Sequence, residues 1–266
     1  MIFAKRIRKI GGCTVASRIG RGRYGVCFLA RDAGGRKVVL KRLRRRMWKK
    51  NRADYHHEAV ILSGLCHPGV PELLGVVNEP RGYYFVLEYM EGYTLADWLF
   101  EKKKIFSAEE VCRIGTQLFD ILEYLHSRSV VHGDISIANV VDDGKKVSVI
   151  DFGLARYSGE KELDFSLDHA RAANVLIYLL YSGYSGRGSR PWHEELPLDE
   201  NQRKFLLDLM QPGGKETEGK GVYRSTSDIK KRFLKYFGQS VRVAIVRSGA
   251  DRESLRQESG QGESQP

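Results

Sequence analysis

Apolar and polar side chains alternate over the N-terminal third of the chain, a pattern typical of half-buried β-strands. Strands are expected at 19–30, 37–41, 70–77 and 82–90, the first of these being interrupted by a glycine loop. Gly34-Gly35 supplies a turn between two of them. One helix is expected from Met47 to Leu65, with Gly64 and Pro68 marking its end. This part of the chain therefore predicts an antiparallel sheet with one helix.

From Thr94 onwards the apolar spacing becomes helical. Ser107-Ala108-Glu109-Glu110 has the spacing of a capping box, in which two side chains satisfy the first free N–H groups of a helix. The apolar positions that follow predict a buried helix: Val111, Ile114, Leu118, Ile121, Leu122 and Leu125. More helices are expected at 172–181, within 196–210 and at 228–237. The tail 248–266 has almost no apolar residues and is expected to be disordered.

Two short apolar runs in the middle of the chain each end in a loop that carries a carboxylate. Val130-Val131 leads to Asp134 and Asn139, and the run 147–150 leads to Asp151. The turn-forming residues 142–146 lie between the runs and predict a hairpin. Asp134, Asn139 and Asp151 could therefore converge, and such oxygen ligands suit Mg²⁺ when substrate phosphates supply further ligands.

Gly20, Gly22 and Gly25 lie in a Gly-x-Gly-x-x-Gly pattern, which leaves backbone N–H groups free to approach a phosphate. A simple hairpin explains the pattern equally well. A dinucleotide-binding loop needs a helix directly after the glycines, whereas residues 26–29 are β-like. The pattern therefore favours a phosphate-binding loop between two strands.

Composition places the chain among ordinary globular proteins, with 266 residues and a net charge of +11. Two basic clusters, at 5–9 and 42–52, contribute much of this charge and could make weak contacts with anionic surfaces. A solvated helix face is the favoured interpretation, and no nucleic-acid-binding motif accompanies the clusters. No apolar run is long enough to span a bilayer, and no secretory signal is recognised. Four scattered cysteines fit free thiols in the cytoplasm.

The order of these segments resembles that of the eukaryotic-type protein kinases. The resemblance implies ATP and Mg²⁺ as cofactors, with Asp134 as catalytic base and Asn139 and Asp151 as metal ligands. It also implies that Lys41 neutralises the ATP phosphates and pairs with Glu58, 17 residues further along the chain. The nucleotide is expected to contact Ile19, Gly20, Gly22, Gly25, Cys27, Val39, Lys41, Leu87, Glu88, Met90 and Val141. His126 and His132 are expected to be structural.

The catalytic loop departs from the family pattern at two positions. Gly133 replaces the arginine that commonly pairs with a phosphate on the activation segment, so activity is expected not to depend on phosphorylation of that segment. Ser136 replaces the lysine of serine/threonine kinases, and Ala138 stands where tyrosine kinases have an arginine. The loop His-Gly-Asp-x-Ser is more similar to that of RIO-type and other atypical kinases. The nature of the acceptor therefore stays open.

The segment after Asp151 is short and lacks the Ala-Pro-Glu motif. Asp168, which resembles the aspartate that begins the central helix of the C-lobe, follows after only 17 residues. Arg224 stands where the family arginine pairs with the missing glutamate, and Glu160 or Glu162 could substitute for that glutamate. Candidate autophosphorylation sites are Tyr157, Ser158 and Ser166.

The sequence predicts an α+β, bilobal kinase-like fold with an N-lobe at 12–90, a C-lobe at 91–240 and a basic segment at 1–11. The predicted function is transfer of the ATP γ-phosphate to a protein hydroxyl, in the manner of a serine/threonine kinase. Two alternatives remain. The chain could be an ATP-binding pseudokinase scaffold, or an atypical kinase or ATPase that acts on a small molecule or on itself.

Overall fold

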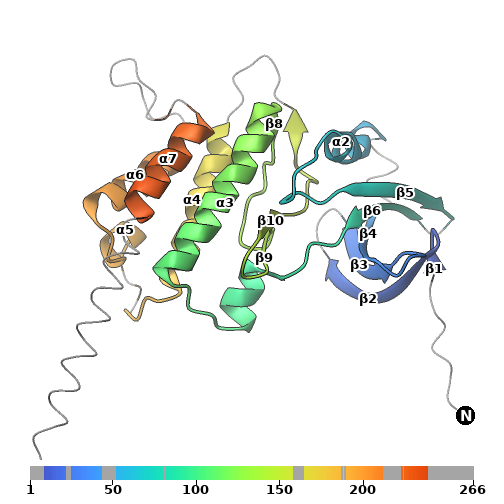
Figure 1. Cartoon of the computed structure of the whole chain (residues 1–266), viewed down its shortest axis with the longest axis horizontal. Helices are drawn as coiled ribbons and strands as arrows, with labels where there is room; N and C mark the ends of the chain where they lie inside the picture. The colour runs from blue at the N-terminus through green and yellow to red at the C-terminus, as the bar shows by residue number, and fades with distance from the viewer. Residues whose placement is uncertain are drawn as a thin grey trace, which may run out of the picture.

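The computed structural model describes residues 9–21, 25–43, 52–80, 82–157, 165–186, 188, 190–211, 223 and 225–238, except for the side chains of 52–56. The described chain forms two lobes (Figure 1), with a curled sheet and one helix at one end and a group of helices at the other. The expected α+β, bilobal fold is confirmed. The predicted disordered tail and most of both basic clusters lie outside the described residues.

The N-lobe is an antiparallel sheet in the order β1-β2-β3-β4-β6-β5. Its strands are β1 (Lys9–Ile10), β2 (Cys13–Arg21), β3 (Gly25–Arg31), β4 (Lys37–Leu43), β5 (Leu73–Glu79) and β6 (Gly82–Glu88). One face of the sheet buries a small apolar cluster that includes Ala30, Val38, Leu40 and Tyr84. The other face packs toward α2 (Arg52–Ser63) and the interlobe region through residues such as Leu43 and Phe85.

Several N-lobe boundaries differ from those expected from the sequence: β2 begins at Cys13, β4 ends at Leu43, β5 ends at Glu79 and β6 ends at Glu88. The strand expected at 70–77 begins only at Leu73, because Pro71 has no N–H to donate to a strand pair. The helix expected from Met47 is described only as α2, and residues 44–51 lie outside the described part of the chain. The turn Gly34-Gly35 joins β3 to β4 as expected.

The C-lobe is built around α3 (Ala108–Ser127), which begins with the expected capping box: the Ser107 side chain accepts from the Glu110 N–H, and the Glu110 side chain accepts from the Ser107 N–H. Around α3 lie α4 (Phe165–Tyr181), α5 (Trp192–Glu195), α6 (Glu200–Met210) and α7 (Thr226–Phe237). Phe119, Phe205 and Phe233 form the aromatic centre of this lobe. Burial of such side chains supplies most of the favourable free energy of folding.

Short strands carry the chain between the lobes and through the catalytic region. They are β7 (Tyr93–Thr94), β8 (Val130–Val131), β9 (Val140–Asp142), β10 (Val147–Val149) and β11 (Arg156–Tyr157), and β7 is followed by the π-helical turn η1 (Asp97–Glu101). The predicted hairpin is β9–β10, and β7 pairs with its outer edge. β11 pairs with β8, so the chain after Asp151 lies beside the strand that precedes Asp134.

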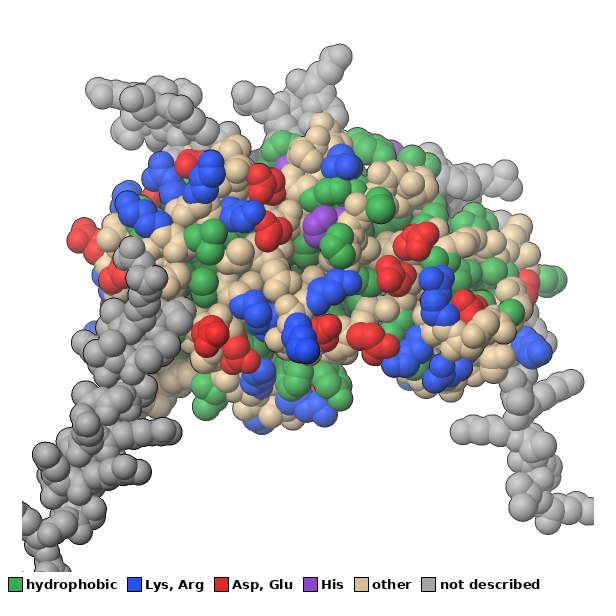
Figure 2. Space-filling model, viewed as in Figure 1, with side chains coloured by type: hydrophobic (Ala, Val, Ile, Leu, Met, Phe, Trp, Pro, Cys, Tyr) green, Lys and Arg blue, Asp and Glu red, His purple; other side chains and the backbone are tan. Residues whose placement is uncertain are grey.

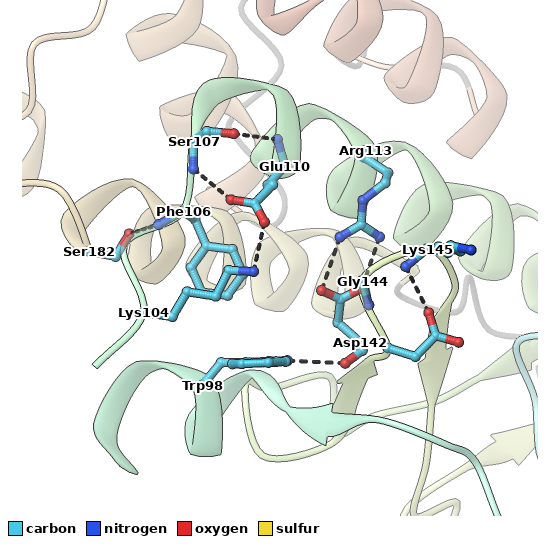
Figure 3. A network of polar contacts seen from close by, with 11 residues as sticks. Trp98, Lys104, Phe106, Ser107, Glu110, Arg113, Asp142, Gly144, Lys145 and Ser182 are labelled. Carbon is cyan, nitrogen blue, oxygen red and sulfur yellow. Dashed lines mark hydrogen bonds and ion pairs between the residues drawn. The ribbon is translucent and has the colours of Figure 1, made fainter. Parts of the chain in front are cut away.

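The β9–β10 hairpin is fixed to α3 and η1 by polar contacts (Figure 3). The Arg113 guanidinium on α3 binds both carboxylate oxygens of Asp142 at 2.9 and 3.0 Å. The indole N–H of Trp98 on η1 donates to the Asp142 carbonyl oxygen at 3.0 Å. The position of the hairpin, which leads into Asp151, is therefore set by the C-lobe.

Charged side chains of both signs are interspersed over the face seen in Figure 2, with no extended area of a single sign among the described residues. None of the helices in the described part of the chain has the length and apolar character needed to cross a membrane. All four cysteines are free thiols, as expected.

Candidate active site

Lys41 is the link between the two lobes. It lies on β4 between Cys27 on β3 and Phe85 on β6, and only 3% of the residue is exposed. Its Nζ is 2.5 Å from Oε1 of Glu58 on α2 and 2.7 Å from Oδ1 of Asp151 in the C-lobe. Burial alone lowers the pKa of a lysine, but the two carboxylates outweigh this and hold the pKa of Lys41 above its ordinary value. The ammonium is therefore charged at every physiological pH.

Asp151 follows β10 and has a left-handed backbone conformation with a φ of 65°. A non-glycine residue there is strained, and such strain is common at functional sites. Burial opposes ionisation, but the Lys41 ammonium and the Gly153 N–H hold the pKa of Asp151 below its ordinary value. The neighbouring Phe152 is buried and contacts the His132 ring edge to face, with 4.7 Å between centroids. The Asp-Phe-Gly segment is thus directed toward Lys41.

Asp134 and Asn139 meet in the loop after β8. The Asn139 side-chain amide donates to both the carbonyl oxygen and Oδ2 of Asp134, each at 2.9 Å. The amide nitrogen is therefore turned toward Asp134, which leaves the amide oxygen as the atom of Asn139 that could bind a metal. Asn139 is also tied to Asp151, because the Asn139 carbonyl accepts from the N–H of Ile150 at 2.8 Å. The three predicted oxygen-bearing residues are thus brought together.

Asp168 on α4 anchors the main chain of the catalytic loop. Its two carboxylate oxygens accept from the N–H groups of His132 and Gly133, each at 2.8 Å. His126 on α3 contacts the same carboxylate through Nε2 at 3.1 Å and Thr226 on α7 through Nδ1 at 2.7 Å. Both histidines therefore have structural surroundings, as expected from the sequence. Burial lowers the pKa of His132, which favours its neutral form.

The backbone explains why glycine occupies position 133. Gly133 has a φ of +73°, and a Cβ there would lie 2.9 Å from the carbonyl oxygen of Leu154. An arginine, which the family commonly has at this position, is therefore excluded without movement of the following segment. Arg224, Glu160, Glu162 and Ser158, which the sequence singled out in connection with the same segment, lie outside the described residues.

Arg171 is a site residue that sequence reasoning missed. It lies on α4, one turn after Asp168, and its Nη1 is 3.1 Å from Oδ1 of Asp134. The signal that could have found it is the spacing: residues three apart on a helix share a face, so Arg171 faces the same loop as Asp168.

The expected nucleotide-contacting residues that the structure describes come from five strands, β2, β3, β4, β6 and β9, and from the interlobe link. Val39 and Leu87 are paired neighbours on β4 and β6, and Val141 lies on β9. Met90 and Val141 are buried, whereas Ile19 on β2 is 48% exposed. This apolar set suits the two faces of a flat aromatic base.

Some backbone groups at the edge of the expected nucleotide site already form hydrogen bonds within the protein. The N–H of Glu88 donates to the Glu72 carbonyl at 2.9 Å, so only the carbonyl of Glu88 is left to accept from a base. Gly20 and Gly25 lie at the ends of β2 and β3, and a Cβ on Gly25 would collide with the Arg42 carbonyl. Gly22 lies outside the described residues. Burial raises the pKa of Cys27 to about 11, so its thiol is protonated beside Lys41.

The donor set fits a nucleotide-bound divalent cation. Asp151 supplies a carboxylate and Asn139 an amide oxygen, which are the hard ligands that Mg²⁺ takes alongside phosphate oxygens. No group of three or more His, Cys, Asp or Glu side chains within the described residues forms a self-contained metal site. A cation held here would therefore need ligands from a bound phosphate.

These features are those of a protein kinase fold, with Lys41 held between Glu58 and Asp151. The protein kinase domain model matches residues 13–173, which is more than half of the chain, and the chain therefore belongs to the protein kinase family.

Relatives of known name agree with this. The chain is 30% identical over 223 residues to a probable serine/threonine-protein kinase, YbdM, of Bacillus subtilis, covering 80% of this chain and 84% of that protein. It is 32% identical to serine/threonine-protein kinase C of Synechocystis over 53% of this chain and 29% of that protein. It is 35% identical to discoidin domain-containing receptor tyrosine kinase B of Caenorhabditis elegans over 54% of this chain and 18% of that protein. The last two matches cover less than a third of each relative.

Proposed function

We propose that this protein transfers the γ-phosphoryl group of ATP, with Mg²⁺, to serine or threonine hydroxyl groups of proteins. The observation that carries the proposal is the buried chain of charges from Glu58 through Lys41 to Asp151, at 2.5 and 2.7 Å. This arrangement supports the proposal, because the permanent positive charge of Lys41 would neutralise the α- and β-phosphates of ATP. Of the three relatives named above, the one that the chain covers most fully is a probable serine/threonine-protein kinase, which favours serine or threonine as acceptor.

Each polar residue has a distinct task in this proposal. Mg²⁺, when bound, neutralises charge on the phosphates, and Asn139 and Asp151 would hold it. The Asp134 carboxylate accepts the proton of the acceptor hydroxyl, and the Asn139 amide fixes its orientation at 2.9 Å. Val39, Leu87, Met90 and Val141 exclude water around the base.

The proposal includes activity without phosphorylation of the activation segment. Gly133 offers no guanidinium to receive a phosphate, and a Cβ at this position would lie 2.9 Å from the Leu154 carbonyl oxygen. We also propose a cytoplasmic location, because four free thiols suit a reducing compartment.

The test is incubation of the purified protein with γ-labelled ATP, Mg²⁺, mixed protein acceptors and a panel of small hydroxyl compounds. We expect label on protein serine and threonine, loss of transfer in Asp134→Asn and retention of ATP binding in that variant. Wild-type protein pretreated with a phosphatase should remain active. ATP binding without transfer to any acceptor would support a scaffold and contradict the proposal, whereas label on small molecules alone would contradict the choice of acceptor.

A further inference from the structure

The ion pair between Arg171 and Asp134 lies at the reacting end of the site. Arg171 Nη1 binds Asp134 Oδ1 at 3.1 Å, while Asp134 Oδ2 accepts from Asn139 at 2.9 Å. The two side chains of the pair are 35% and 33% exposed. A ligand in the site can therefore reach this pair.

The loop does not need Arg171 as a brace. Asp168, which is fully buried, already holds the main chain of the loop through the N–H groups of His132 and Gly133. Asn139 already orients the Asp134 side chain. A half-exposed arginine adds little stability to a loop held in this way. Its charge is therefore its distinctive contribution.

Transfer of a phosphoryl group places negative charge on three oxygen atoms near the attacking hydroxyl, and a cation there stabilises the transition state. Ser136 and Ala138, which follow Asp134 in the loop, carry no charge. Lys41 is enclosed by Glu58 and Asp151. Among the described residues, Arg171 is the positively charged residue that forms an ion pair with Asp134.

The Arg171 guanidinium has donors to spare. Of its five N–H bonds, one on Nη1 donates to Asp134 Oδ1, and the buried Nε has no partner among the described residues. A planar guanidinium can bind a carboxylate with one edge and a phosphoryl oxygen with another.

We infer that Arg171, while paired with Asp134, is the cation that contacts the transferred γ-phosphoryl group, a task for which the loop itself offers no positively charged side chain. This inference rests on the proposed function, because it assigns a residue to the same reaction. It does not need a cation at position 136 or 138.

The experiment compares wild type with Arg171→Gln, Arg171→Lys and the double variant Arg171→Gln with Ser136→Lys. Arg232→Gln is the matched control, because Arg232 makes an exposed ion pair with Asp228 on α7, far from the loop in sequence and fold. We expect kcat of Arg171→Gln to fall about 100-fold with KM for ATP changed less than about threefold. Arg171→Lys and the double variant should each recover about tenfold, and melting temperatures should match that of the control.

A kcat of Arg171→Gln within about threefold of wild type would overturn the inference. A fall in kcat accompanied by a lower melting temperature, with no recovery in either lysine-bearing variant, would make Arg171 a structural brace and would also overturn it.

A binding measurement separates this inference from the proposed function. Calorimetry with Mg²⁺ compares the affinity for a non-hydrolysable ATP analogue with that for ADP. Loss of Arg171 should reduce the preference for the triphosphate about tenfold, even if wild type transfers phosphate to no acceptor. An unchanged preference in Arg171→Gln would refute the contact with the γ-phosphoryl group whether or not wild type is an active kinase.

Discussion

Arg113 and Asp142 form a two-point ion pair across the interior of the C-lobe. The guanidinium binds the two carboxylate oxygens at 2.9 and 3.0 Å, and the Asp142 side chain is 0% exposed while that of Arg113 is 23% exposed (Figure 3). The pair joins α3 to the hairpin that ends at Asp151. Two parallel hydrogen bonds fix the direction as well as the distance of the contact.

Arg113→Leu should destabilise the fold by about 3–5 kcal/mol, because it leaves the buried Asp142 carboxylate without its charged partner. Chemical denaturation measures this. Arg232→Leu, which removes an exposed pair with Asp228, should cost less than about 1 kcal/mol. An equal loss of unfolding free energy in the two variants would show that the buried ion pair contributes no more stability than the exposed one.

Lys41→Met should abolish measurable phosphoryl transfer and weaken ATP binding at least about tenfold, since it removes the charge between Glu58 and Asp151. Lys37→Met is the matched control: it lies on the same strand, and its partner Glu91 is exposed. Calorimetry and a transfer assay check both variants. Normal ATP affinity in Lys41→Met would contradict the assigned role of this lysine.

Gly133→Ala should lower stability by about 1–3 kcal/mol and reduce activity, because a Cβ would press on the Leu154 carbonyl at a φ of +73°. Gly144→Ala also places alanine at a positive φ, +95°, but nothing lies within 4 Å of its Cβ. The control therefore has the backbone cost without the collision. If both variants lose the same stability and Gly133→Ala is fully active, the collision is unimportant.

Asp168→Asn should reduce stability by about 2 kcal/mol at neutral pH, because Asp168 accepts two backbone N–H groups in a buried site. Burial opposes its ionisation, but His126, His132 and the Gly133 N–H hold the pKa of Asp168 below its ordinary value of 3.8. The carboxylate therefore contributes its full stability above that value and loses the contribution as pH falls through the lower, folded-state pKa. Denaturation of wild type and Asp168→Asn over a range of pH should show that the difference in their free energies of unfolding narrows below pH 3.8. A difference that grows on acidification would contradict this.

Cys27 should react slowly with iodoacetamide at pH 7.5, because burial raises its pKa to about 11 and little thiolate is present. Exposed Cys66 should be modified first. Peptide mass spectrometry follows both sites, and Mg-ATP should slow Cys27 further if Cys27 lines the nucleotide site. Faster labelling of Cys27 than of Cys66 would contradict the burial of Cys27 and its raised pKa.

Local sequence patterns predicted the elements and much of the candidate site. The capping box at Ser107 fixed the start of α3, and the 17-residue separation of Lys41 and Glu58 anticipated a contact of 2.5 Å. The turn residues 142–146 anticipated the hairpin before Asp151. These features depend on neighbours in the chain or on a family order of segments.

Other features depend on how distant elements pack, and the sequence did not reveal them. Arg171 meets Asp134 across 37 residues, which requires the position of α4 against the loop. β5 begins only at Leu73, later than the apolar run that predicted it, because Pro71 has no backbone N–H to donate to a neighbouring strand. The sequence shows that Gly133 replaces the family arginine. It does not show that the Leu154 carbonyl leaves no space for a side chain there.

The pairing of β11 with β8 couples two stretches that are remote along the chain. Arg156 and Tyr157 are matched with Val131 and Val130, immediately before the loop of Asp134. A force that displaces the former stretch must either break this two-residue ribbon or shift the loop of Asp134, the proposed general base. A molecule that binds the exposed side of Arg156 and Tyr157 would thereby act on the proposed proton removal without entering the proposed nucleotide site.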